Sequence, residues 1–458
     1  MNTFDTFNIE IETITPLHIG SGGTLSSVGE FITETNKIRY LNTKEISNYL
    51  YKNNLLDKYT DEILHSAESF DTLKSLKDLG LSIDNYITKE TDFAQNKVNV
   101  LHNNVLHEFI EANGCKYIPG SSVKGMIKTV LLYHYLKENN ELIKKIENDI
   151  IDIKKDNLNY QLSHLWEYYE KQIFEKKEFN LLRFTDSDPI DDKSLQVEQL
   201  KRQHLQSVDS EGLDWLSETV RPNTILPLRM QILPQFSQNQ SVLNERNTTS
   251  LFTLINSYST ILLNFEISML SSSSYAGKKD LISKLISLKE EITQSDNEYA
   301  ICRLGKGKTV YFNTLITLLS SKIQSRIIEM YFKTDENSTS FPATRVLTVN
   351  DEMLGWIKIS ALEPKSYSVT NEEIIEQPVV EIIPTQNQVK ELKNQETKLN
   401  VTVNSTKTVT FILNQETYEN VQLINTLKKP LRVGDVIIVT VWQINKSGKI
   451  NQVKIEDI

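Results

Sequence analysis

Residues 117–128 read YIPGSSVKGMIK, a short strand and a turn that lead into a helix. The apolar positions of this helix are Val123, Met126, Ile127, Val130 and Leu131. They recur at the i, i+3, i+4, i+7 and i+8 spacing that places side chains on one face of an α-helix. The stretch therefore predicts an amphipathic helix with one buried face.

The start of this helix is a candidate phosphate site. We expect Ser121 and Ser122 to cap the helix, which leaves its free N–H groups and its dipole pointing out of the turn. Lys124 and Lys128 lie four residues apart, off the apolar face. Between them, Gly125 removes a side chain that would hold a ligand away. The alternative is an ordinary capped helix with a solvated lysine edge, and the stretch alone favours neither.

A second glycine-rich loop, GKGKT at 305–309, follows a strand predicted at 300–304. It is not a P-loop, and Val310 stands where a G-x-G-x-x-G motif has its third glycine. Its candidate RNA-binding residues are Arg303, Gly305, Lys306, Gly307 and Lys308. Backbone donors and positive charge at one place suit a phosphodiester backbone better than a nucleotide. The alternative is a turn that needs glycine for a positive φ.

The N-terminal region contains a third glycine loop. The alternation FNIEIE at 7–12 predicts a half-buried strand, which Pro16 ends. The loop LHIGSGG at 17–23 follows, and its candidate residues are His18, Gly20, Ser21 and Gly22. Because it lies beside a glycine loop, His18 could act as a general acid or base in metal-free RNA cleavage. A lone loop histidine is more often a structural group.

The remaining pattern predicts two further α+β regions and a β-rich tail. Strands are expected at 37–41, 181–184, 226–232, 261–267 and 354–359, and helical segments at 44–112 (an insertion), 137–178, 281–292 and 312–323. A polar run at 190–215 marks a domain boundary. Residues 363–397 have the composition of a linker.

Short strand patterns beyond the linker predict a small all-β, OB-like barrel at 398–458. Lys446, Lys449 and Trp442 of this barrel could grip RNA. A docking module is the alternative.

The net charge of the chain says little about RNA binding until the positions of its charged residues are considered. The 458 residues include 50 Lys and Arg against 60 Asp and Glu, a formal net charge of -10. Taken alone, this argues against nucleic-acid binding, because phosphate contacts need Lys and Arg. Residues 398–458, however, carry eight basic and five acidic side chains, and the lysines of the glycine loops have no acids beside them. We expect weak nonspecific RNA binding by the isolated chain, with grooves completed by partner subunits.

Other features limit the classes of function. Two cysteines, Cys115 and Cys302, exclude a disulfide scaffold and fit a reducing compartment. Without a signal-peptide pattern or an apolar run of membrane length, we expect a cytoplasmic chain with no membrane contact. The histidines form no zinc-type motif, so we expect no metal and no cofactor. Asp186 and Asp188, in TDSDP, fit a turn better than a catalytic carboxylate pair.

Four short motifs occur in order along the chain: TPLHIGSG at 15–22, YIPGSSVKG at 117–125, RFTDSDPI at 183–190 and RLGKG at 303–307. In this order they resemble the RAMP superfamily of CRISPR-associated proteins, and within it the family of fifth Csm subunits of type III-A effector complexes. The resemblance covers about residues 1–362. It implies an α+β fold with two ferredoxin-like (RRM-like) domains, at 1–210 and 211–362, elaborated by helical insertions.

The resemblance also implies a function. Members of this family cap the backbone filament, hold the 3′ part of the crRNA and support its trimming by host ribonucleases, without being nucleases. The loops at 18–22, 121–128 and 303–308 would then contact crRNA. The implied partners are crRNA, the other backbone and small Csm subunits, and host ribonucleases. No aspartate occurs between Asp5 and Asp57, which agrees with a subunit that does not cleave.

Two other interpretations stay open at this point. The first is a metal-independent endoribonuclease of the same superfamily that processes CRISPR transcripts with His18. The second is an interaction module whose glycine loops face neighbouring subunits only.

Overall fold

The strand predicted from the alternation at 7–12 is present in the computed structural model as β1 (Asp5–Thr13). It is the middle strand of a five-stranded sheet with the order β13-β15-β1-β12-β9. The other strands are β13 (Tyr299–Arg303), β15 (Trp356–Ala361), β12 (Ile225–Ile232) and β9 (Leu182–Phe184). Ile11 pairs with Leu226 on one side and with Ile359 on the other, and all three are buried. The alternating apolar residues of β1 therefore lie in the core.

The structure describes residues 5–362 with gaps at 35, 67–69, 95–104, 154–157, 175–181, 207–213, 233–246, 310, 313 and 333–342, and then five strands within 398–455. Residues 1–366 and residues 367–458 form two compact units. The linker predicted at 363–397 lies outside the described residues.

A second five-stranded sheet has the order β14-β10-β11-β6-β2. Its strands are β14 (Thr344–Thr348), β10 (Leu195–His204), β11 (Asp214–Val220), β6 (Val105–Phe109) and β2 (Gly20–Ser26). The pairing of β11 with β6 is parallel and the others are antiparallel. The glycine loop at 17–23 thus runs into an edge strand, whose register shifts between Gly20 and Thr24.

The two predicted halves of the α+β region are interleaved. Each sheet combines strands from 1–210 with strands from 211–362, and all of them belong to one compact unit. The polar run at 190–215 contains β10, whose buried polar side chains are Gln196, Glu198, Gln199 and Gln203. The boundary expected at 210/211 therefore does not separate two compact units.

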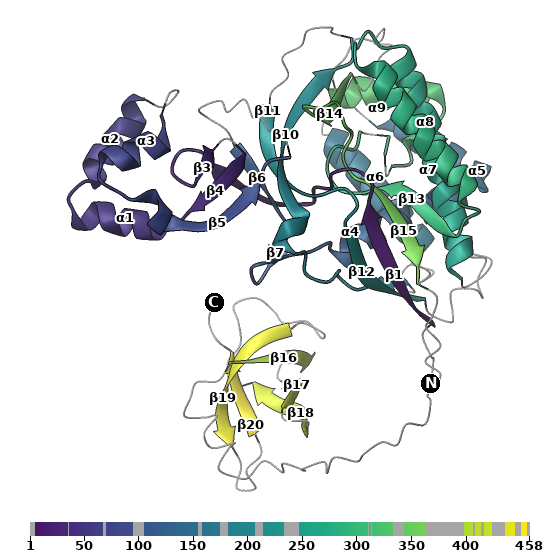
Figure 1. Ribbon diagram of the computed structural model, residues 1–458. Coiled ribbons are helices and arrows are strands. Elements are labelled where there is room, and N and C mark those ends of the chain that lie inside the picture. Colours follow the sequence, from purple (N-terminus) through teal and green to yellow (C-terminus); the bar gives the residue numbers. More distant parts are fainter. Residues whose placement is uncertain are drawn as a thin grey trace, which may run out of the picture. The chain divides into compact units, whose positions relative to one another are not determined.

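Helices pack against the first sheet, where α4 contacts β9 and both α7 and α8 contact β13 (Figure 1). The helices are α4 (Gly120–Lys137), α5 (Asn140–Asp152), α6 (Leu158–Phe174), α7 (Thr248–Ser271), α8 (Lys278–Gln294) and α9 (Ser321–Phe332). The predicted apolar face of α4 is buried. The strand predicted at 261–267 is wrong, because those residues lie inside α7. The helix predicted at 312–323 is replaced by a 3-10 turn, η5 (Ile316–Leu318), and the start of α9.

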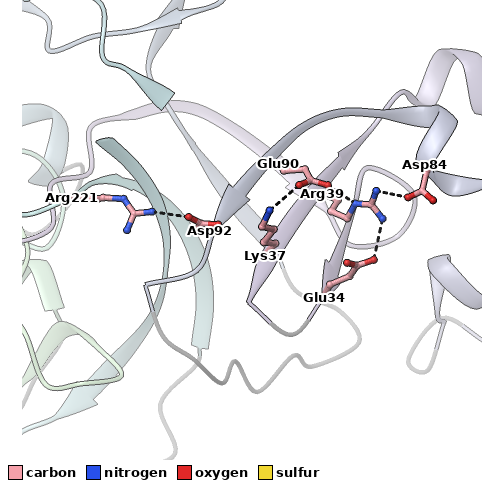
Figure 2. A network of polar contacts seen from close by, with 7 residues as sticks. All are labelled: Glu34, Lys37, Arg39, Asp84, Glu90, Asp92 and Arg221. Carbon is pink, nitrogen blue, oxygen red and sulfur yellow. Dashed lines mark hydrogen bonds and ion pairs between the residues drawn. The ribbon is translucent and has the colours of Figure 1, made fainter. Parts of the chain in front are cut away.

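The insertion between β2 and β6 has a hydrophobic core of its own. It consists of β3 (Phe31–Glu34), β4 (Lys37–Leu41), α1 (Thr43–Lys52), α2 (Leu56–His65), α3 (Thr72–Asp78), the 3-10 turn η1 (Ile83–Tyr86) and β5 (Ile87–Asp92). Figure 2 shows Arg39 paired with Glu34, Asp84 and Glu90. Arg221, directly after β11, pairs with Asp92 at 3.3 Å and so joins the insertion to the second sheet.

Two short elements and a barrel complete the described chain. β7 (Glu111–Ala112) and β8 (Cys115–Lys116) form a small hairpin, and η3 (Asp192–Ser194) precedes β10. Five strands form a closed barrel in the order β16-β17-β18-β20-β19. They are β16 (Lys398–Ser405), β17 (Thr408–Leu413), β18 (Glu416–Leu423), β19 (Val436–Ile444) and β20 (Ile450–Ile455). The all-β barrel is confirmed, while Lys446, Lys449 and the Trp442 side chain lie outside the description.

Candidate functional site

Two of the predicted glycine loops meet although they lie far apart in the sequence, at 17–23 and 303–308. The Lys306 N–H donates a hydrogen bond of 2.8 Å to the His18 carbonyl oxygen. A third segment joins them, since the Gly355 N–H donates to Pro16 O at 2.9 Å and the Leu304 N–H donates to Gly355 O at 2.8 Å. The backbone of the 303–308 loop is therefore fixed directly to the 16–20 segment.

Glycine is required at these contacts. Gly305 has a φ of +74°, and a Cβ at this position would lie 2.2 Å from the His18 carbonyl oxygen. Gly355 has a φ of +83°, and its Cβ would lie 2.1 Å from Leu304 O. A side chain at either position would be strained and would push the two loops apart. The interpretation of the GKGK loop as a turn that needs glycine is thus confirmed. The same turn also borders the pocket described next.

The meeting of the loops creates a pocket of about 400 Å³. The residues that line it are His18, Ile19, Gly20, Gly22, Gly23, His107, Glu108, Gly305 and Lys306. Five of the predicted residues, from both glycine loops, are therefore brought together. His107 and Glu108 are new to the site. They enter it because β6 pairs with the shifted edge strand β2, with Thr24 opposite His107, and no local pattern in the sequence signals that register.

His18 is only 2% exposed and lies beneath the pocket. Its Nδ1 is 2.6 Å from the carbonyl oxygen of Glu218. Because a carbonyl oxygen only accepts, we assign the proton to Nδ1 and leave Nε2 unprotonated. Burial lowers the pKa of His18 to about 4, and nearby Lys306 acts in the same direction. A neutral, buried imidazole is a poor general acid and brings no positive charge to a phosphate, so the contact between His18 and RNA stays a prediction without an ionic component.

The low pKa of His18 predicts a loss of stability in mild acid. Well above pH 6.5 the ring is neutral in both the folded and the unfolded chain, and its contribution to stability is complete. As the pH falls from 6.5 toward 4, the unfolded chain binds a proton that the folded chain excludes, so stability decreases by up to about 3 kcal/mol. Urea unfolding of the wild type and of His18→Gln across this range should show a shallower decline in the variant. Equal slopes would contradict this assignment.

Arg303 points inward, which corrects its prediction as an RNA contact. The side chain is 3% exposed. Its Nε donates to Leu354 O and its Nη2 donates to Gly307 O, both at 2.9 Å. The guanidinium carbon lies 4.7 Å from the ring centroid of Phe312, and burial lowers its pKa to about 10. Arg303 therefore holds the GKGK loop in place from the inside.

The two lysines of the GKGK loop are half-buried. Lys306 Nζ lies 5.2 Å from the ring centroid of Trp215. Burial lowers the pKa of Lys306, and burial together with Arg303 lowers the pKa of Lys308 to about 8. Among the described residues, neither ammonium group forms an ion pair with an acidic side chain. Partly desolvated cations without a counterion are favourable places for a phosphate.

The start of α4 differs from the prediction. Its N-cap is Pro119, so Ser121 and Ser122 lie within the first turn and do not cap the helix. The Gly120 N–H donates to Asp186 Oδ1 at 2.8 Å, so a carboxylate already occupies the helix end that was expected to attract phosphate. Asp186 thereby satisfies a backbone donor, as the turn interpretation of TDSDP predicts.

Lys124, Gly125 and Lys128 form a second, separate surface on α4, which does not line the pocket. The lysines are half-buried, and burial together with Lys124 lowers the pKa of Lys128. Gly125 is exposed, and a Cβ there would meet no atom within 4 Å. An exposed glycine inside a helix costs about 1 kcal/mol relative to alanine. Since internal packing does not require this glycine, it leaves room for a ligand beside the two lysines.

The described residues contain no group of three or more His, Cys, Asp or Glu side chains that could hold a metal ion. Within the same part of the chain, no helix is both long enough and apolar enough to cross a membrane.

The mixed α/β fold, with two glycine loops from distant parts of the sequence beside one pocket, agrees with the family comparison. The model of the RAMP superfamily matches residues 10–435. Because the match covers most of the chain, this protein belongs to the RAMP superfamily.

Within that superfamily the similarities are to Csm5 proteins. The "CRISPR system Cms protein Csm5" of Streptococcus thermophilus is 29% identical over 235 residues, which is 49% of this chain and 63% of the relative. The protein of the same name from Methanocaldococcus jannaschii is 27% identical over 31% of this chain and 34% of the relative. Alignments to these curated relatives thus span less than two thirds of their length.

A solved structure supports the fold. One chain of a cryo-EM structure of a Csm–crRNA–target RNA ternary complex of a type III-A CRISPR–Cas system matches with a TM-score of 0.55. The match covers 78% of this chain and 100% of the other, at 18% sequence identity.

Proposed function

We propose that this chain is a non-catalytic subunit of a type III-A Csm effector complex that caps the backbone filament and binds the 3′ part of the crRNA. The observation that carries the proposal is the pocket where the 18–23 and 305–308 loops meet, with Lys306 and Lys308 unpaired by acids in the described part of the chain. Membership of the RAMP superfamily and similarity to Csm5 proteins support it. The contacts would be to backbone and shape rather than to base sequence.

The same proposal includes the finer architecture and the partners. We interpret the two interleaved sheets as ferredoxin-like RAMP domains. We also interpret the closed barrel as OB-like, and the parallel pairing of its third and fifth strands, β18 and β20, supports this interpretation. The partners of the whole chain would be crRNA, the neighbouring backbone and small Csm subunits, and host ribonucleases that trim the crRNA in the cytoplasm.

The proposal is tested by removing charge at the candidate sites. Lys124, Lys128, Lys306 and Lys308 are changed together to Met in the full complex. Retention of crRNA should weaken, and the slope of log affinity against log salt should fall by up to about 3, because each phosphate contact to single-stranded RNA contributes about 0.7. The matched control changes four exposed lysines of the insertion to Met, namely Lys44, Lys52, Lys58 and Lys74. Equal effects of the two sets would contradict the proposed sites.

The endoribonuclease alternative has a separate test. The pure chain is incubated with repeat RNA in EDTA, and the RNA is examined for cleavage. We expect intact RNA, because the His18 ring is buried and held neutral by its surroundings. Cleavage by the wild type that is lost in His18→Ala would overturn the non-catalytic assignment.

A further inference from the structure

Trp215 lies directly behind the wall of the pocket. It is a half-buried residue of β11, and Lys306 Nζ lies over its ring at 5.2 Å from the centroid. The ring of His107, which lines the pocket, meets Trp215 edge-on at a centroid separation of 6.3 Å. An aromatic face and a lysine from distant segments are thus held against each other at the pocket wall.

Both members of this pair lack a polar partner. The Trp215 Nε1–H is buried and has no hydrogen-bond acceptor among the described residues. Lys306 forms no ion pair within the same part of the chain, and its ammonium group rests on the indole ring instead. Buried indole N–H groups usually find an acceptor, and partly desolvated ammonium groups usually find an anion. The shared deficit indicates a ligand with acceptor oxygens.

We propose that this pocket binds one nucleotide of single-stranded RNA, with Lys306 turning onto its phosphate and the indole face of Trp215 stacking on its base. This inference rests on the proposed function and names the contacts within it. The attraction between a cation and an indole ring is only about 0.5–2 kcal/mol. A phosphate that binds Lys306 and a base that stacks on Trp215 can therefore together replace the contact between these two side chains. Stacking on an aromatic face also tolerates every base, as a guide of variable sequence requires.

The shape and charge of the pocket fit this ligand. Its volume of about 400 Å³ falls within the range of small-ligand pockets. Gly20, Gly22 and Gly23 also line the pocket, and a Cβ on Gly22 would meet nothing within 4 Å. Glu108 lines the pocket as well. Its carboxylate repels a phosphate, which leaves the Lys306 side as the place for the anion.

The test measures binding of the full chain to labelled single-stranded RNA, together with a series of oligonucleotides that each carry one abasic position. Trp215→Leu should weaken binding by about 5- to 150-fold, with the salt slope unchanged. Trp215→Phe should stay within a few fold of the wild type, since it keeps an aromatic face. Lys306→Met should instead lower the salt slope by about 0.7.

The abasic series separates stacking from a general loss of structure. One abasic position should weaken binding to the wild type by a similar factor, and the same position should cost nothing further in Trp215→Leu. Additive losses would overturn the stacking contact.

If Trp215→Leu binds RNA normally while Lys124→Met with Lys128→Met weakens binding, this inference fails and the proposed function stands. If Trp215→Leu binds RNA normally but no longer assembles with Csm subunits, the pocket is a protein interface and the inference is wrong. Failure of the full complex assembled with the wild-type chain to retain crRNA overturns both.

Discussion

Gly305→Ala is expected to lower the free energy of unfolding by about 2–4 kcal/mol and to weaken RNA binding by at least tenfold. A left-handed backbone costs a non-glycine residue roughly 1–2 kcal/mol. The added Cβ would also lie 2.2 Å from the His18 carbonyl oxygen, so one loop must move. That movement breaks the Lys306 N–H hydrogen bond to His18, whose loss adds about 1–3 kcal/mol when the groups stay buried. Urea unfolding and RNA-binding titrations measure the two effects.

Gly114→Ala is the matched control for this substitution. Gly114 also has a positive φ, of +76°, but a Cβ there would meet no atom within 4 Å. It lies in the turn between β7 and β8, outside the pocket. The control therefore keeps the strain of a left-handed residue and omits the collision between loops. If both variants unfold at the same urea concentration and bind RNA equally, contact between the loops does not support the pocket.

Glu218→Gln is expected to lower the free energy of unfolding by about 3–5 kcal/mol, the usual cost of breaking a buried ion pair. The carboxylate is 2% exposed and pairs with the buried ammonium group of Lys116. It also accepts hydrogen bonds from Tyr40 Oη at 2.7 Å and from the Phe109 N–H at 2.8 Å. These partners come from the insertion, β6 and β8, and the Glu218 backbone carbonyl holds His18. A neutral amide leaves Lys116 without its buried counterion and places an NH₂ group among donors.

Two comparisons make this prediction specific. Glu90→Gln removes a carboxylate that pairs with Lys37 and Arg39 at the surface of the insertion, and should destabilise the fold far less than Glu218→Gln, because solvent screens these exposed pairs. Glu218→Gln combined with Lys116→Met should be less destabilised than Glu218→Gln alone, because the unpaired charge is removed with its partner. If Glu218→Gln is as stable as Glu90→Gln in urea unfolding, the buried Glu218 carboxylate does not stabilise the fold as proposed.

Periodic patterns predicted the elements that have one buried face. The apolar residues of α4 and the alternation of β1 are both confirmed. The strand expected at 261–267 is wrong because the apolar residues Ile261, Phe265 and Ile267 of α7 lie outside its buried stripe and are only partly buried. In so short a stretch they hide the helical period. The polar run at 190–215, which was interpreted as a domain boundary, contains strand β10. The polar side chains of β10 are buried in the sheet, but in the sequence a run of polar residues indicates an exposed loop.

Local sequence patterns were enough to predict many of the elements and the glycine turns, because periodicity and backbone freedom are properties of neighbouring residues. The order of the family motifs can also be read from the sequence. The role of each side chain depends on the tertiary structure. The fold joined the 18–23 loop to the 305–308 loop, turned Arg303 inward, set Asp186 against the start of α4 and brought Trp215 behind Lys306. These roles depend on hydrogen bonds and burial between segments far apart in the chain, which no local pattern encodes.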